Sequence, residues 1–236
     1  LVICFYTIST FIAGIIIWFF FKNETNESSS ESILLAFKKV KKFLKVISYQ
    51  ALIVLSAYSA FKGVDYYSQY FYDILNYSKE KSAATMSNLS YLRPICAILA
   101  GIIADKISAT KQSIYLFIIL SISFLYISLI SLTMNIEILI FINVITSMIA
   151  VFALRGIYFC YLKETNIPSS VTGLSVGIIS LIGFFPDVYI GPVFGYFLDN
   201  YNKELSYNLC YIFLFIISVI GLISSFKLHH VKKLSD

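Results

Sequence analysis

The chain has 236 residues, of which 58% are hydrophobic and 13% are charged, with a net charge of +5 and a mean hydropathy of +0.82. A soluble domain carries about 25% charged residues, so this composition excludes a soluble enzyme, a nucleic-acid-binding module and a disordered tail. The apolar residues suffice for roughly seven membrane spans of about 20 residues, and they form continuous runs. The sequence therefore predicts an all-α, polytopic helical membrane protein embedded in a lipid bilayer.

Seven apolar segments follow one another along the chain, and we interpret each as a transmembrane helix. The first is too long for a signal-peptide core and no basic stretch precedes it, so we expect a true span and a chain that is a fragment of a longer protein. The connections after the second span are short, which predicts antiparallel neighbours. The predicted spans are Val2–Phe21, Val46–Tyr72, Ala84–Ala104, Ser113–Leu132, Ile136–Tyr161, Val171–Leu198 and Tyr207–Phe226.

A linker, residues 22–45, separates the first span from the others. Its first part is polar, and its second part reads ILLAFKKVKKFLK, with apolar residues at helical spacing and lysines on the other face. This pattern is typical of a helix lying on a membrane surface, and a charged, partly helical linker is the alternative. We expect residues 46–227 to form a six-helix bundle and residues 228–236 a tail.

The distribution of lysine predicts the orientation. Twelve lysines fall on the side of the first loop and the C-terminal tail, whereas only Lys79, Lys81 and Lys203 fall on the other side. Cytoplasmic loops of membrane proteins carry the excess of basic residues, so we expect the central loop and the C-terminus in the cytoplasm and the protein in the plasma (inner) membrane. Topology thus accounts for the net charge, and no nucleic-acid partner is needed.

Five charged side chains lie well away from the ends of the predicted spans, where a charge costs at least about 2.5–3.5 kcal/mol at mid-depth. Lys62 and Asp65 share one face of the second span, and Arg93, Arg155 and Asp187 lie in the third, fifth and sixth. Such charges either pair and lock helices together or face a water-filled path. For Lys62 and Asp65 both readings stay open. Arg93 and Asp187 each adjoin a proline that frees a backbone carbonyl, so for these two we favour a path.

Tyrosine adds to the same face of the second span, because Tyr58 and Tyr66 align there with Lys62 and Asp65. A tyrosine side chain both stacks on a ligand and donates a hydrogen bond. The surplus of cations indicates a small solute that is anionic or zwitterionic. The expected substrate and ion pathway consists of Tyr58, Lys62, Asp65, Tyr66, Arg93, Arg155 and Asp187.

Small residues recur at a spacing of four in two predicted spans. The sixth span contains the pairs Gly173 with Gly177 and Gly191 with Gly195. The third contains the pairs Ala97 with Gly101 and Ala100 with Ala104. Small residues at this spacing let helix backbones approach closely. They serve either rigid packing or helices that rock past each other.

The chain contains no motif of a membrane-embedded enzyme or of an ATP-driven pump. Both histidines lie in the C-terminal tail, and the four cysteines are scattered without metal-ligand spacing. The zinc-protease motif HExxH, the nucleophile motif GxSxG and the Walker A loop do not occur. We expect no catalytic activity, no cofactor and no metal site.

The segment after the third span, GIIADKISATK, resembles the signature loop of the major facilitator superfamily. That loop reads Gly, three residues, Asp, a basic residue, one residue, Gly and then basic residues. Gly101, Asp105 and Lys106 match it, whereas Ser108 stands at the second glycine and Lys111 follows one position late. The segments RGIYFCYLKE and PDVYIGPVFGYFLD also look like the tenth and eleventh helices of bacterial members.

This resemblance implies that the chain is the last helix of the first half, the central loop and the whole second six-helix half of such a transporter. It implies alternating access about a midplane site, with the N-terminal half as the missing partner. Gly101, Asp105 and Lys106 would form a gating loop, in which Asp105 holds a neighbouring helix end in one gate state.

The expected function is secondary active transport of a small polar solute, coupled to protons through Asp65 or Asp187, since protonation relieves the desolvation cost of a buried carboxylate. A seven-helix receptor-like membrane protein is the alternative, because the count of seven fits. Against the receptor, the last span has no lysine at mid-depth for a retinal Schiff base, and the long basic loop follows the first span.

Overall fold

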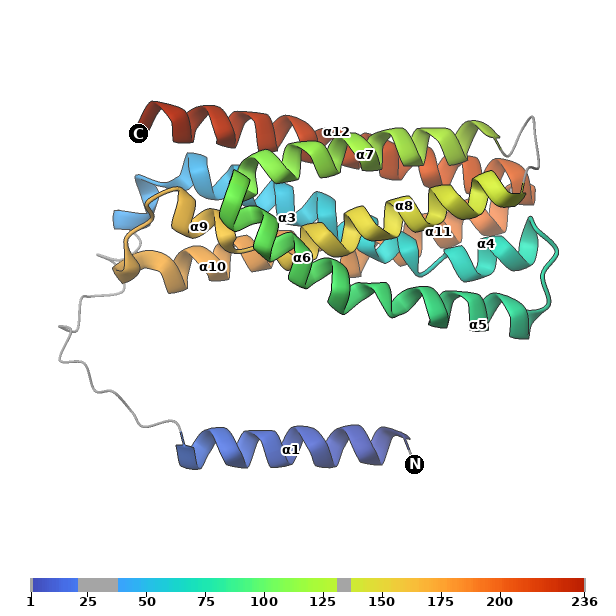
Figure 1. The fold of residues 1–236 in the computed structure, drawn as a ribbon, viewed down its shortest axis with the longest axis horizontal. Coiled ribbons are helices and arrows are strands. Elements are labelled where there is room, and N and C mark those ends of the chain that lie inside the picture. Colours follow the sequence, from blue (N-terminus) through green and yellow to red (C-terminus); the bar gives the residue numbers. More distant parts are fainter. Residues whose placement is uncertain (1, 21–37, 131–136, 236) are drawn as a thin grey trace. The chain divides into compact units, whose positions relative to one another are not determined.

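A computed structural model describes residues 2–20, 38–130 and 137–235, and these residues form helices and short connections without a strand (Figure 1). Seven helical segments among them are long and apolar enough to cross a membrane, which confirms the prediction of a polytopic helical membrane protein. The chain divides into two compact units, residues 1–35 and 36–236. The first unit contains the uninterrupted helix α1 (Val2–Phe20). The polar half of the linker and the start of its basic half lie outside the described residues.

The second unit is a bundle whose long helices run alongside one another (Figure 1). Helix α12 packs along both α7 and α3, α8 packs against α6 and α7, and α10 packs against α3. The helices are α3 (Leu44–Val64), α4 (Tyr67–Asp73), α5 (Lys79–Ser90), α6 (Leu92–Ile107), α7 (Ala109–Ile130), α8 (Glu137–Gly156), α9 (Cys160–Glu164), α10 (Ser169–Gly183), α11 (Pro186–Asn200) and α12 (Lys203–Ser235).

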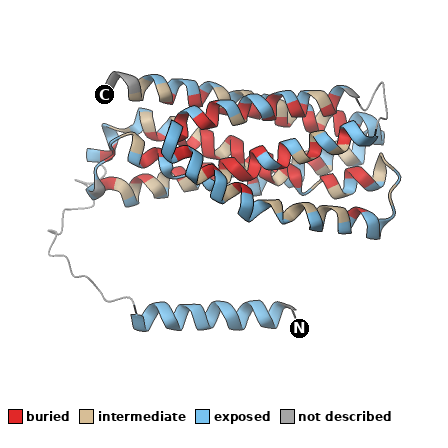
Figure 2. Ribbon diagram, viewed as in Figure 1, coloured by how far each residue is buried: buried red, intermediate tan, exposed pale blue. Residues whose placement is uncertain are grey.

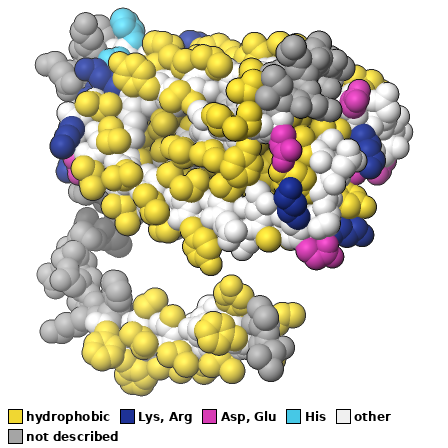
Figure 3. All heavy atoms as spheres, turned by 45° about the vertical axis from the view of Figure 1, so that its right-hand side comes forward, with side chains coloured by type: hydrophobic (Ala, Val, Ile, Leu, Met, Phe, Trp, Pro, Cys, Tyr) yellow, Lys and Arg dark blue, Asp and Glu magenta, His cyan; other side chains and the backbone are white. Residues whose placement is uncertain are grey.

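An aromatic core lies where α4, α7 and α12 meet. Tyr67, Tyr70, Phe124, Tyr207 and Tyr211 are all buried there, and the ring of Tyr211 stacks at 5.7 Å from Tyr67 and 6.4 Å from Phe124. The buried residues follow the facing sides of the helices (Figure 2). The outer surface is apolar along its middle, with charged side chains gathered toward its ends (Figure 3), as a membrane-spanning bundle requires.

Four of the predicted spans are split into two helices. Asp65 and Tyr66 separate α3 from α4, Tyr91 separates α5 from α6, and Phe184 and Phe185 separate α10 from α11. A three-residue turn likewise follows α8 and leads into the short α9. Splitting of a span is tolerated in a membrane where the freed backbone groups find partners or line a cavity.

The prolines account for two of these breaks. Pro94 lies in the first turn of α6 and Pro186 is the first residue of α11, positions at which the missing proline N–H is not needed for a helical hydrogen bond. At the break before α11, the Phe185 N–H bonds instead to the Ile182 carbonyl at 3.2 Å. Pro94 and Pro186 thus lie at the beginnings of new helices and do not kink continuous ones.

Close backbone approach occurs at glycines other than the predicted pairs. A Cβ atom added to Gly156 would lie 2.7 Å from the carbonyl oxygen of Ala97, where α8 crosses α6. The prediction of close approach through the glycines of the sixth span is wrong for the described residues. A Cβ atom added to any of the four glycines on α10 and α11 would meet no atom of another described helix within 4 Å. These glycines are Gly173, Gly177, Gly191 and Gly195.

Candidate functional site

A groove with a volume of about 330 Å³ opens between α11 and the α3–α4 break. Lys62, Asp65, Tyr66 and Gln69 line one side and Asp187 contributes to the other. The break at residues 65–66 replaces regular helical bonding by turn bonding, since the Asp65 N–H bonds to the Lys62 carbonyl at 3.3 Å. Two broken spans therefore meet at the groove and bring charges of both signs to it.

An ion pair between Lys62 and Asp187 joins α3 to α11 beside this groove. The Lys62 Nζ atom lies 2.6 Å from Oδ1 of Asp187, and the Tyr58 hydroxyl donates a hydrogen bond of 3.0 Å to Oδ2. Asp187 lies in the first turn of α11, where the positive end of the helix dipole also favours a carboxylate. Lys62, Tyr58 and the N-terminal end of α11 therefore all make favourable interactions with the Asp187 carboxylate.

The possibility that Lys62 pairs with Asp65 is not realised. Asp65 is the residue that caps α3, directly after its last residue Val64. Among the described residues Lys62 pairs with Asp187 instead. Asp65 lines the groove and makes no ion pair or hydrogen bond with the described part of the chain, while the Tyr66 ring packs 4.6 Å from Phe194.

The two arginines of the site make cation–π contacts with aromatic rings. The guanidinium carbon of Arg155 lies 3.8 Å from the centre of the Phe61 ring, and that of Arg93 lies 5.2 Å from the same ring. A second contact places Arg93 5.3 Å from the Phe152 ring. Arg155 is in the last turn of α8, where the helix dipole favours a cation. The structure thus gathers all seven residues of the expected pathway, and their role in transport stays a prediction.

The signature segment is almost wholly helical, and only one residue separates its two helices. Gly101, Asp105 and Lys106 lie on α6, which ends at Ile107, and α7 begins at Ala109. Ser108 between them has φ 82°, a conformation that glycine adopts without strain. Asp105 is exposed and makes no ion pair or hydrogen bond with the described residues, so its proposed gating role has no contact here to support it.

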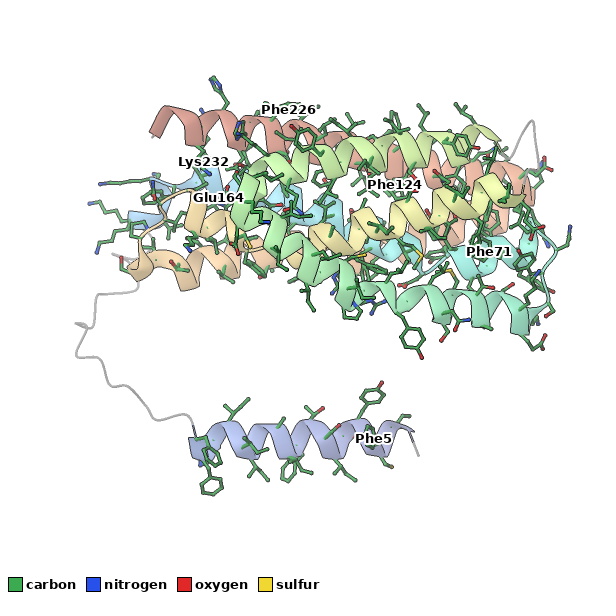
Figure 4. All side chains as sticks on the ribbon, viewed as in Figure 1. Phe5, Phe71, Phe124, Glu164, Phe226 and Lys232 are labelled. Atoms are coloured by element: carbon green, nitrogen blue, oxygen red, sulfur yellow. The ribbon has the colours of Figure 1, made fainter. Side chains whose placement is uncertain are left out.

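A different carboxylate, Glu164 at the end of α9, occupies the N-terminus of α7. It accepts hydrogen bonds from the backbone N–H of Ala109 and, at 3.3 Å, of Thr110, and its other contacts are the Ser108 hydroxyl and Lys232 Nζ, both at 3.2 Å. Figure 4 places Glu164 and Lys232 next to each other. Sequence reasoning missed this residue, because it assigned the cap to Asp105.

Substitution of Glu164 by Gln is expected to lower stability by about 0.5–2 kcal/mol near neutral pH, the usual cost of losing a helix cap. Burial raises the pKa of the Glu164 carboxyl, but hydrogen bonds from Ala109 and Lys232 outweigh burial and the pKa lies below its ordinary value. The charged form therefore stabilises the fold above the ordinary carboxyl pKa of about 4.3. That contribution is lost as pH falls through the lower pKa of the folded state.

The measurement is the melting temperature of the purified full-length protein and of E164Q from pH 7 down to the acid limit of folding. The two curves should converge at the acid end. The exposed Glu204, in the first turn of α12, provides the matched control, and E204Q should stay much closer to the unsubstituted protein than E164Q does. A constant difference between E164Q and the unsubstituted protein would contradict the assignment.

A second polar cluster, also missed by sequence reasoning, ties α4 to the start of α12. Lys203 Nζ lies 2.7 Å from Oδ1 of Asp73, and the buried Tyr207 donates a hydrogen bond of 2.8 Å to Oδ2. Tyr77, between α4 and α5, likewise donates to Glu137 at the start of α8. Each of these contacts joins residues more than 50 positions apart, so no local pattern in the sequence indicates them.

Comparison with known proteins gives one distant relative. No protein-family model matches the chain, and no solved structure matches it. The chain is similar to the inner membrane protein YqcE of Escherichia coli (strain K12), with 24% identity over 223 residues, covering 88% of this chain and 51% of that protein. The chain therefore spans about half the length of the curated relative that it matches.

Proposed function

We propose that the chain is part of a secondary transporter that moves a small polar solute across the membrane by alternating access. The observation that carries the proposal is a groove between broken helices that brings Lys62 and Asp187 together, with Arg93 of α6 and Arg155 of α8 on the ring of nearby Phe61. Charged groups within membrane spans are costly, and they persist where they form a substrate or ion path. Discontinuous helices at such a path are a recurring feature of secondary transporters.

We further propose that the transporter is of the major facilitator type and that this chain supplies its C-terminal half. The left-handed Ser108 supports this, because it occupies the second glycine position of the signature loop and adopts a conformation suited to glycine. The relative is about twice as long as this chain, which is consistent with a second helical half in the working unit. Its printed name favours the inner membrane as the location, and the lysine distribution favours a cytoplasmic linker and C-terminus.

Within this proposal Asp65 is the residue that takes up the coupling proton. Asp187 is engaged by Lys62 and Tyr58, so its protonation would sacrifice the charge attraction of the Lys62 ion pair. Asp65 lines the same groove and has no ion pair or hydrogen bond to a described residue that would have to be broken. Neutralising a carboxylate there changes the charge balance of the groove and couples pH to conformation.

The proposal is tested with the full-length protein reconstituted into liposomes. An inward proton gradient is imposed, and uptake is measured for labelled carboxylates, phosphate esters, amino acids and sugars. We expect at least one of these solutes to accumulate, with accumulation abolished by a protonophore. An Asp65→Asn variant should lose gradient-driven accumulation but keep exchange of that solute across the membrane. Liposomes that accumulate none of the solutes would contradict the transport proposal.

A further inference from the structure

The two arginines of this chain lie at the same place in the fold. The sequence has eighteen basic residues, of which Arg93 and Arg155 are the two arginines and all the others are lysines. The two arginines come from α6 and α8, which are far apart in sequence, and both contact the ring of Phe61 on α3. Arg155 also lies 6.0 Å from the ring of Tyr58, whose hydroxyl bonds to Asp187 of the groove, so the arginines lie near the groove.

The aromatic contacts orient these guanidinium groups without using their hydrogen-bond donors. A guanidinium carries five N–H donors in a planar fork, and a cation–π contact engages the face of the group rather than its N–H edge. Neither Arg93 nor Arg155 forms an ion pair with a carboxylate or donates a hydrogen bond within the described residues. The nearby Asp187 carboxylate is already bound by Lys62.

Resting on the transport function proposed above, we propose that Arg93 and Arg155 together bind an oxyanion group of the transported solute, a carboxylate or a phosphate. Arginine matches the geometry of both groups, because its fork donates two parallel hydrogen bonds to two oxygen atoms. Two such forks stacked about one ring present donors from two helices to a single anion. The remaining basic residues are lysines. A lysine ammonium group is a point charge and lacks this geometry.

The proposal also predicts which solutes the site rejects. Placing a cation between two arginines and Lys62 adds a fourth positive charge, and Asp65 is the single carboxylate of the groove that no lysine engages. A neutral solute leaves the guanidinium donors without acceptors, which costs binding free energy when water is excluded. The groove of about 330 Å³ suits a small solute, since ligand pockets begin at about 300 Å³.

The first experiment measures the melting temperature of the purified full-length protein in detergent at fixed ionic strength and pH. The soluble probes are malonate and inorganic phosphate, with choline and glucose as the cationic and neutral comparisons. We expect malonate or phosphate to raise the melting temperature in proportion to the logarithm of its concentration, as binding to the folded state requires. Choline and glucose should leave it unchanged.

Variants then locate the binding. R93Q and R155Q should weaken binding of the stabilising anion by about tenfold or more, the effect of losing one charge-assisted contact. R155K keeps the charge and should still weaken binding, because lysine lacks the fork. The control is K81Q on the exposed part of α5, which should bind like the unsubstituted protein. Binding that survives in both R93Q and R155Q, or stabilisation only by choline or glucose, would overturn the proposal.

Two further readouts keep the result interpretable if an arginine variant fails to fold. Phenylglyoxal modification of Arg93 and Arg155 in the unsubstituted protein, followed by mass spectrometry, should slow in the presence of the stabilising anion. Phosphatidylglycerol is tested in the same way. If this lipid raises the melting temperature and neither malonate nor phosphate does, the arginines bind a lipid headgroup and the solute proposal is overturned. Liposomes that transport a neutral or cationic solute would refute this inference while leaving the transport function standing.

Discussion

Substituting Asp187 with Asn is expected to reduce uptake by about tenfold or more, while the protein still inserts and folds. The change removes the negative charge that pairs with Lys62 and replaces one of the two accepting oxygens by an NH₂ group, and it leaves a lysine charge without its counter-ion at the groove. Losing one charge-assisted contact costs about 1.5–3 kcal/mol, or roughly ten- to a hundredfold in a rate or affinity. Uptake in liposomes is the measurement, with the amount of folded protein determined in parallel.

The partner substitution makes this prediction specific. K62Q alone should also reduce uptake, and the K62Q/D187N double variant should lose less than the two single losses combined, because each single variant leaves one charge unpaired. The matched control is Asp199→Asn at the exposed end of the same helix, which should transport normally. Additive losses in the double variant would show that the two side chains act independently.

Replacing Gly156 with Ala is expected to destabilise the bundle. The added Cβ atom would meet the carbonyl oxygen of Ala97 at 2.7 Å and its Cα atom at 2.9 Å. These are backbone atoms, which cannot rotate aside, so α8 must separate from α6. Overpacking of this kind costs about 1–3 kcal/mol, and the melting temperature of the full-length protein should fall accordingly.

Gly101→Ala is the matched control for that change. Gly101 lies on α6 one turn after Ala97, and a Cβ atom there would have nothing within 4 Å. Alanine favours a helix interior over glycine by about 0.8–1.0 kcal/mol, so this variant should melt at the same temperature or higher. If both variants melted alike, the contact between α6 and α8 would not be as close as the structure places it.

Much of the fold follows from the sequence, because a bilayer imposes a simple rule on a chain. A continuous apolar run must become a helix that satisfies its own backbone, and all seven predicted spans are present as membrane-crossing segments. Pro94 and Pro186 marked two of the broken spans. The break at Asp65 and Tyr66 contains no proline, and its one local sign is Gly63 just before it, a residue that is common in continuous membrane helices as well.

The candidate site was predictable as a set of residues but not as a set of contacts. Intramembrane charge alone identified Lys62, Arg93 and Asp187, since such residues are rare and costly. Which cation meets which carboxylate depends on how distant helices pack. Helical spacing allowed Lys62 to pair with Asp65, whereas the packing of α11 on α3 gives it Asp187. The same dependence on long-range packing hid Glu164, which is distant in sequence from the helix that it caps.

Helix α5 enters a bilayer poorly by itself. Lys79, Glu80, Lys81, Ser87 and Asn88 are all exposed on it, and membrane insertion of a nascent helix depends on how apolar that helix is. Within the span Lys79–Ile107, α5 packs against the earlier helix α4, whereas α6 packs against α7 and α8, which are synthesised later. The third span therefore gains its packing partners in two steps, one before and one after its own synthesis, so the order of synthesis makes membrane insertion of this bundle a cooperative event.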